Sequence, residues 1–238
     1  MSHFTCLVIG QNVEEQLEQF NENTEMPDYI RSTKAELIAE SRKEIEEYRD
    51  SGFYAQYMTN PEEYIKDCHQ GHINYVTKRF PNEVLPLLND DNALWEYAVR
   101  HHKYDDGNYD DEIDDEGNLH STRNPNSQWD WYELGGRWAG FYRLKDGGQG
   151  AVGSPGLMTP PAEAGAVDSA MKKDILPEDL YKSTFAIIKD GKWYEKGKMG
   201  WWACVSNEKD QEVWDAEFRK MIDELPDDAL LSVYDLHI

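Results

Sequence analysis

The sequence predicts an α+β protein with an antiparallel or mixed sheet and a helical excursion on one side of it. Three observations support this class. Apolar runs with strand character occupy residues 3–10 and 229–238, and helical patterns fill most of 33–104. Further strand patterns lie between residues 128 and 205. The sheet is therefore expected to combine the N-terminal strand with residues 118–238.

Start signals mark the expected helices. Thr33 and Glu36 have the spacing of a capping box, in which each side chain bonds a free backbone N–H at the helix start. Pro61 suits the first position of a second helix, where the missing N–H is not needed. Two further helical patterns cover 91–102 and 208–224.

Turn signals separate the expected strands. Asp190-Gly191 divides two alternating runs and is typical of a two-residue hairpin turn. Residues 128–144 predict two strands, with Gly135-Gly136 as the turn or bulge between them. Residues 200–205 predict another strand.

The expected organisation is a single domain spanning 1–238. Within it, the helical insertion covers 33–104, an acidic loop covers 105–118, and a Gly/Pro-rich surface loop covers 146–165. A loop of the last kind is either functional or disordered.

The balance of acidic and basic residues limits the partners that the protein can bind. With 24 basic and 47 acidic residues the formal charge is -23. Such a field repels nucleic acid and anionic membranes, and it would attract a basic protein surface or serve solubility alone. The apolar start has no basic segment before it, so it is interpreted as a strand and not as a signal peptide. The three cysteines are widely spaced, which favours reduced thiols in a cytoplasm.

A candidate catalytic group combines His3 and Thr5 of the first strand with Asp235 and His237 of the last strand. Residues two apart in a strand share a face, and both strands are expected in one sheet. His-x-Thr is the element that two-histidine phosphoesterases use, with one histidine as base and the other as acid. A second copy occurs at residues 120–122. The alternative is two ordinary strand histidines with a hydrogen-bonded aspartate.

A candidate ligand site surrounds Gly135-Gly136. Trp129 and Trp131 alternate and should share one strand face, and Arg137 can grip a phosphate bidentately. The alternative is that the aromatic residues form the core of the sheet. The residues expected to bind a nucleotide-like ligand are Trp129, Trp131, Arg137, Trp138, Trp201, Trp202, Lys172 and Lys173.

The acidic tract is a candidate partner-binding surface, in which carboxylates would stand in for nucleic-acid phosphates. Its members are Asp105, Asp106, Asp110, Asp111, Glu112, Asp114, Asp115 and Glu116. A calcium loop is disfavoured because no register supplies both the required Gly and the required Glu. Cys68, His69 and His72 precede His101-His102, but Gly71 interrupts the helix that a zinc site would need. No metal and no cofactor is expected.

Three motifs carry a family resemblance: Ser2 to Gly10, Asn124 to Trp138, and Asp235 to Ile238. In these motifs the chain resembles a family of proteins encoded mainly by bacteriophages and prophages. The blocks Pro155 to Met158 and DGKWYEKGKMGWW are similar to that family as well. The resemblance implies a phage origin and a place in the host cytoplasm. It implies no catalytic residues.

Three functions follow as hypotheses. In the first, the protein is a phage accessory protein that binds and inhibits a host component, with its acidic surface as a nucleic-acid mimic. In the second, it binds a nucleotide-like small molecule, such as a cyclic nucleotide signal, and either sequesters it or hydrolyses it with His3 and His237. In the third, it is a virion or scaffold component.

Overall fold

The computed structural model describes residues 2–66, 68–105, 111–156 and 163–238. Contacts divide the chain into two compact units. The first combines Met1–Glu25 with Arg123–Ile238, and the second is Met26–Thr122. The helical region expected at 33–104 lies within the second unit. A mixed sheet accompanied by helices confirms the predicted α+β class.

The first unit is built on one sheet, to which eight of the described strands belong. They are β1 (His3–Ile9), β4 (Trp131–Gly136), β5 (Gly150–Ala151), β6 (Ser154–Pro155), β7 (Ser169–Met171), β8 (Ala186–Lys189), β9 (Lys192–Glu195) and β12 (Leu230–His237). Their order is β5-β7-β12-β1-β8-β9, with β4 also paired to β12 and β6 paired to β4. In the centre, β1 is antiparallel to β12 and parallel to β8. The sheet is therefore mixed.

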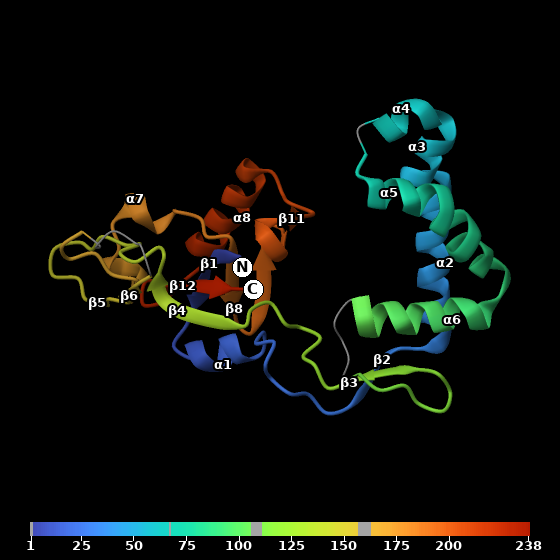
Figure 1. The fold of residues 1–238 in the computed structure, drawn as a ribbon. Coiled ribbons are helices and arrows are strands. Elements are labelled where there is room, and N and C mark those ends of the chain that lie inside the picture. Colours follow the sequence, from blue (N-terminus) through green and yellow to red (C-terminus); the bar gives the residue numbers. More distant parts are fainter. Residues whose placement is uncertain (1, 67, 106–110, 157–162) are drawn as a thin grey trace. The chain divides into compact units, whose positions relative to one another are not determined.

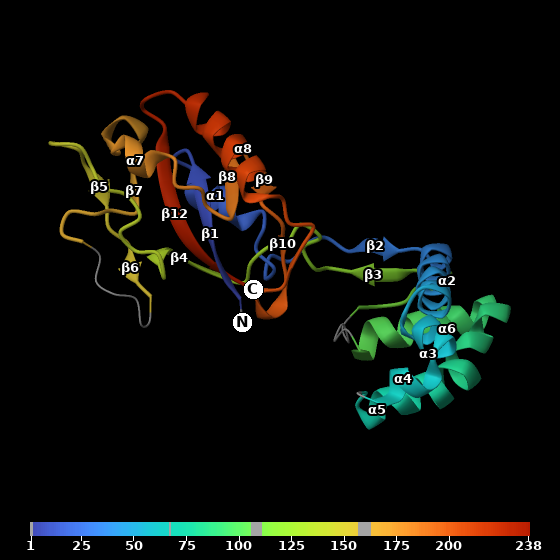
Figure 2. The same cartoon turned by 90° about the horizontal axis from the view of Figure 1, so that it is seen from above.

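Each face of this sheet is covered by one helix. On β1 and β12 the odd-numbered side chains, such as Leu7 and Val233, face helix α8 (Gln211–Asp223). The even-numbered side chains, such as Phe4, face helix α1 (Val13–Glu18). Figure 1 shows the two helices on opposite sides of the sheet, and Figure 2 shows β1 and β12 side by side within it. The alternation places His3, Thr5, Asp235 and His237 on the α8 face.

The hairpin expected around Asp190-Gly191 is confirmed. These two residues join β8 to β9 with φ angles of 52° and 69°. Positive φ at both positions is the geometry of a type I′ turn, which matches the twist of the strands. The remaining short elements of this unit are η4 (Lys172–Asp174), α7 (Pro177–Leu180), β10 (Lys198–Met199), η5 (Trp201–Ala203) and β11 (Val205–Ser206).

The strand expected at 200–205 is wrong, because a 3-10 turn, η5, interrupts it. Trp202 and Ala203 adopt φ angles of 61° and 57°, which side chains rarely tolerate. The Ser2 hydroxyl holds the turn: it donates to the carbonyl of Gly200 and accepts from the N–H of Ala203, both at 2.8 Å. The turn is thereby tied to the residue before His3.

Residues 128–144 form one strand instead of the two expected. β4 begins at Trp131 after a bend at Asp130, whose N–H donates to the carbonyl of His237. After Gly136 the chain leaves the sheet, and only isolated bridges at Tyr142 and Leu144 follow. The bend also breaks the alternation that was expected to place Trp129 and Trp131 on one face.

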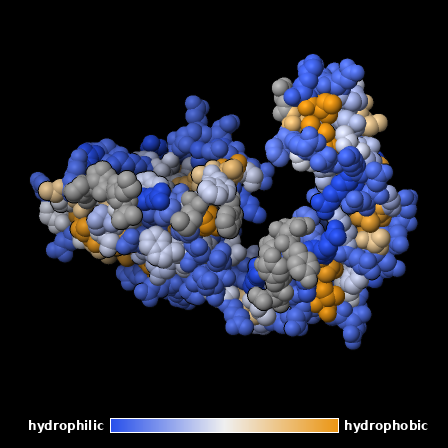
Figure 3. All heavy atoms as spheres, viewed as in Figure 1, coloured by the Kyte–Doolittle hydropathy of each residue, from blue (hydrophilic) through white to orange (hydrophobic). Residues whose placement is uncertain are grey.

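The second unit is mainly helical. Its elements are β2 (Tyr29–Ser32), α2 (Lys34–Asp50), α3 (Phe53–Thr59), α4 (Pro61–Lys66), α5 (Gln70–Asn74), the π-helix η1 (Tyr75–Val84), the 3-10 helix η2 (Leu85–Asn89), α6 (Asp91–Arg100), the π-helix η3 (His101–Asp105) and β3 (Leu119–Ser121). The capping box at Thr33 and Glu36 is confirmed, and so is the helix start at Pro61. Its largest core cluster is Ile45, Phe80, Val84 and Leu94. Figure 3 shows that hydrophilic residues predominate on the viewed surface of each unit.

Candidate active site

Two histidines face each other at one end of the central strand pair. His3 of β1 lies directly opposite His237 of β12. Ser2 and Ile238, one step further along, exchange both backbone hydrogen bonds. His3 and His237 are therefore a non-hydrogen-bonded pair, the position in which cross-strand side chains approach most closely. Their ring centroids lie 4.9 Å apart at an interplanar angle of 67°.

Each imidazole has its own carboxylate. The Nδ1 atom of His3 lies 2.8 Å from Oδ1 of Asp235, and Nδ1 of His237 lies 2.5 Å from Oδ1 of Asp130. An ionised carboxylate can only accept, so Nδ1 carries the proton in both rings and the neutral rings keep Nε2 as an acceptor. No described protein group bonds either Nε2, and each histidine side chain is 14% exposed. Both Nε2 atoms can thus exchange protons with a ligand or with water.

The two carboxylates differ in burial. The side chain of Asp235 is 2% exposed, whereas that of Asp130 is 33% exposed. The second oxygen of Asp235 accepts the backbone N–H of Arg137 at 2.9 Å. Asp235 is therefore fixed from two sides, and it fixes the orientation of His3 in turn.

Gly136 makes this arrangement possible. Its φ is +53°, and a Cβ on it would fall 2.3 Å from Cβ of Asp235. Only a residue without a side chain lets β4 pass so close to β12 here. Gly135-Gly136, expected as a turn or bulge between two strands, instead lies at the end of β4, where Gly136 closely approaches the catalytic candidate Asp235.

Thr5 shares the face of the histidines, but it has a backbone partner. Its Oγ1 accepts the N–H of Phe185 at 2.9 Å, and Thr5 is 9% exposed. The other His-x-Thr copy lies on β3 of the second unit, where His120 bonds to Asp28 and Asp114. The structure thus brings together His3, Asp235 and His237 as predicted, with Thr5 beside them.

Trp131 and Arg137 border the histidine pair. Trp131 lies opposite His237 on β4, and its ring makes an edge contact with His3 at a centroid distance of 6.3 Å. Trp131 is 47% exposed. Arg137 is exposed and follows Gly136 directly. Among the described residues its guanidinium has no hydrogen bond or ion pair, although its backbone bonds Asp235.

Other residues expected to bind a ligand lie elsewhere. Trp129 is 3% exposed and belongs to the α1-side core, so it cannot serve as a stacking surface. Lys172 donates to the carbonyl of Leu225. Lys172 and Lys173 lie beside the start of β12, about 23 Å along the strand from His237. They therefore do not contribute to the histidine site.

The remaining tryptophans have varied positions. Trp202 is 80% exposed on the turn held by Ser2. Trp138 is half-buried, and its N–H bonds the carbonyl of Gly135. The side chain of Trp201 lies outside the described part of the structure.

The acidic tract is only partly a surface. Asp111 is 4% exposed and binds Arg31, His102 and Ser121, so it is unavailable to a partner. Asp114 is half-buried and accepts from the backbone and side chain of Asn118. The exposed carboxylates are Glu112, Asp115 and Glu116. Asp106, Asp110 and the Asp105 side chain lie outside the described residues.

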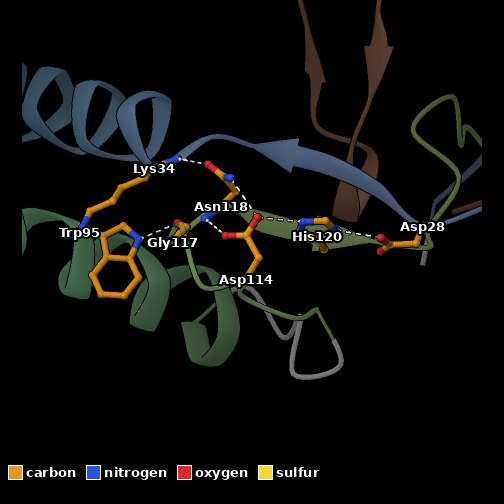
Figure 4. Close-up of polar contacts among 7 residues, drawn as sticks. All are labelled: Asp28, Lys34, Trp95, Asp114, Gly117, Asn118 and His120. Carbon is orange, nitrogen blue, oxygen red and sulfur yellow. Dashed lines mark hydrogen bonds and ion pairs between the residues drawn. The ribbon is translucent and has the colours of Figure 1, made fainter.

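His120 joins Asp114 to Asp28, as Figure 4 shows. Its Nδ1 lies 2.8 Å from Asp28 and its Nε2 lies 3.2 Å from Asp114. These two hydrogen bonds raise the pKa of His120 above its ordinary value. Desolvation opposes the shift at Asp114, but its bonds to Asn118 and His120 prevail and lower its pKa to about 2.

The candidate zinc ligands Cys68, His69 and His72 have other hydrogen-bond partners. Cys68 donates to the carbonyl of Tyr64, His72 bonds the Tyr64 hydroxyl, and His69 accepts from the N–H of Gly71. Within the described ranges, no three His, Cys, Asp or Glu side chains are arranged to hold a metal ion.

No local sequence pattern points to three buried or partly buried carboxylates. Asp130 is the partner of His237, and only the pairing of β4 with β12 reveals this. Asp168 accepts three backbone N–H groups, from Gly140, Phe141 and Gly153. Asp179 binds Arg143 bidentately, which lowers the pKa of Asp179 well below its ordinary value. All three depend on long-range contacts that no local pattern encodes.

Comparison with protein-family models, with curated proteins and with solved structures found no match to this chain. None of the described helices has the length and apolar character that crossing a membrane requires.

Proposed function

We propose that the first unit hydrolyses phosphodiesters by general acid–base catalysis, with His3 and His237 as the proton-transferring groups. The observation that carries the proposal is the pair of opposed His–Asp dyads. In both, Nδ1 is held by a carboxylate and Nε2 has no partner among the described residues. Two separately oriented imidazoles are what a reaction with one proton acceptor and one proton donor needs.

The reaction balances within this pair. The neutral histidine accepts a proton at Nε2 from a water molecule, whose oxygen forms a bond to phosphorus. The bond between phosphorus and the leaving oxygen breaks, and the protonated histidine donates its Nε2 proton to that oxygen. The products are a phosphomonoester and an alcohol. One proton exchanged with solvent on each ring restores the starting state.

The carboxylates give the rings their orientation. Asp235 and Asp130 are positioning residues, since they hold Nδ1 and leave Nε2 toward the substrate. One histidine bonded to an aspartate would also fit two ordinary strand histidines. The second dyad, His237 with Asp130, on a ring that faces His3, favours catalysis. A phage accessory protein that removes a host nucleotide signal would suit this chemistry and the family resemblance.

Turnover of defined diesters by single variants tests the proposal. The purified protein is assayed against a chromogenic phosphodiester, 2′,3′-cyclic nucleotides and cyclic dinucleotides. His3→Ala and His237→Ala should each lower kcat by about 10²- to 10⁴-fold. His69→Ala, an exposed histidine of the second unit, serves as the control and should leave kcat unchanged. Failure of the wild type to turn over any diester, or full activity in both variants, would overturn the proposal.

A second candidate function rests on charge. The net charge of -23 and the exposed Glu112, Asp115 and Glu116 favour capture of a basic host protein. Replacing these three with Gln should weaken such a complex, and its affinity should fall steeply with salt because exposed charge pairs are screened. A host complex that survives both changes would contradict it.

A further inference from the structure

Among the residues that the structure describes, the guanidinium of Arg137 has no hydrogen-bond or ion-pair partner, and the residue lies beside the histidine pair. Two other arginines are occupied: Arg143 binds Asp179, and Arg31 binds Asp111. Within the described ranges Arg100 and Arg219 have no ion pair either, but each lies over a tyrosine ring. The backbone N–H of Arg137 is bound to Asp235, which in turn holds His3. Two hydrogen bonds, through Asp235, thus link the backbone of Arg137 to Nδ1 of His3. The guanidinium can bind an anion.

Trp131 offers an aromatic surface at the same end of the sheet. It is opposite His237 in register, touches the His3 ring by an edge contact, and stays 47% exposed. A large aromatic side chain on the α8 face would normally be buried. Trp129, two residues earlier, is buried in the core of the opposite face. The exposed face of Trp131 is thus available for stacking with a planar group.

We propose that Arg137 and Trp131 select a nucleotide as the substrate, an inference that rests on the proposed phosphodiester hydrolysis. The Arg137 guanidinium binds the non-bridging phosphate oxygens, and the Trp131 indole stacks on the base next to the scissile diester. In the proposed complex, the phosphate lies next to the two Nε2 atoms. Diesters that lack an aromatic base gain only the arginine contact.

Two substrates separate the two contacts. One is a dinucleoside monophosphate such as ApA, and the other is a base-free diester, glycerophosphoethanolamine. Trp131→Leu should lower the ratio of kcat/KM for the dinucleotide to kcat/KM for the base-free diester by roughly 5- to 150-fold, the range that loss of one stacked base gives. The ratio cancels any effect that the variant has on both substrates through the neighbouring His3 ring. Trp131→Phe keeps an aromatic face and should restore most of the loss.

Arg137→Gln should lower kcat/KM for both substrates, whereas Lys173→Gln makes the same charge change at the far end of β12 and should affect neither. Equal losses on both substrates in Trp131→Leu would overturn the inference. A lower kcat/KM for the dinucleotide in Trp202→Leu, without the same change in Trp131→Leu, would overturn it as well.

Binding distinguishes failure of this inference from failure of the proposed function. In a His3→Ala/His237→Ala double variant, ApA should still quench tryptophan fluorescence, and Trp131→Leu in that background should weaken binding. ApA binding through Trp131 without turnover in the wild type would support the substrate class and reject catalysis. Turnover of the base-free diester with no effect of Trp131→Leu on ApA would reject the substrate class alone.

Discussion

Gly136 lies so close to Asp235 that a Cβ on residue 136 would fall 2.3 Å from the aspartate Cβ. The contact places the backbone N–H of Arg137 on the second oxygen of Asp235, while the first oxygen holds His3. The orientation of His3, a proposed catalytic residue, thus depends on a glycine in a neighbouring strand.

Gly136→Ala should destabilise the protein by about 2–4 kcal/mol, because it adds a steric clash to the cost of a left-handed φ. Chemical denaturation measures this loss. Gly147→Ala is the matched control, since Gly147 has φ +80° with no atom within 4 Å of the added Cβ. It should cost only about 1–2 kcal/mol. Equal losses in the two variants would mean that the approach to Asp235 is not tight.

Asp235→Asn should lower kcat by about 10²- to 10⁴-fold, because the His3 ring would no longer be held in the productive tautomer. The side-chain amide would also place an N–H group against one of the two donors, His3 Nδ1 or the Arg137 N–H, which should cost about 1–3 kcal/mol of stability. Asp130→Asn should reduce kcat in the same way through His237. Its effect on stability should be smaller because Asp130 is 33% exposed and Asp235 only 2%. Activity that survives in both variants would contradict the positioning role.

The turn at Asp114–Gly117 of the second unit should become less stable as pH rises. Both ring nitrogens of His120 contact carboxylates, which requires the protonated ring. Because the pKa of His120 is raised by folding, its stabilisation is fully present below the ordinary value of 6.5 and is lost as pH rises through the folded value. Amide exchange at Asn118 and His120, compared with His120→Gln at each pH, measures this. A protection difference that does not shrink above the folded pKa would contradict it.

At low pH, the contribution of Asp114 to the stability of this turn has the opposite pH dependence. Its pKa is lowered to about 2 from 3.8, so its contribution is present above 3.8 and is lost as pH falls toward 2. Asp114→Asn should therefore reduce protection of the same turn near neutral pH and make no difference near pH 2. A constant difference across that range would contradict the pairing with Asn118 and His120.

Salt should separate the two proposed functions. A field of -23 slows the approach of an anionic diester, so screening should raise kcat/KM between about 20 and about 200 mM salt. Capture of a basic protein should weaken over the same interval. Stopped-flow or initial-rate measurements at several salt concentrations give the sign. A kcat/KM that falls with salt would contradict the expected repulsion.

The sequence was sufficient where local chemistry decides the structure. Apolar runs at both ends predicted two strands in one sheet, and β1 and β12 formed there, although the register that sets His3 opposite His237 comes from their long-range pairing. The capping box at Thr33 and the turn at Asp190-Gly191 also formed as predicted, because each needs only neighbouring residues.

Long-range contacts decided the rest. A local alternation placed Trp129 and Trp131 on one face, but the chain bends between them at Asp130, which bonds His237 through both its backbone and its side chain. An apolar run predicted a strand at 200–205, but Ser2 holds its centre as a turn. Charge density predicted a solvated acidic tract, but Asp111 is buried by Arg31 and His102.

The pH dependence of kcat/KM for the wild type, His3→Ala and His237→Ala tests the central claim most directly. With one histidine acting as base and the other as acid, the wild type should give a bell-shaped profile. Each variant should lose one limb of the bell, and the two variants should lose opposite limbs. If both variants keep the bell, or if both lose the same limb, His3 and His237 are not an acid–base pair.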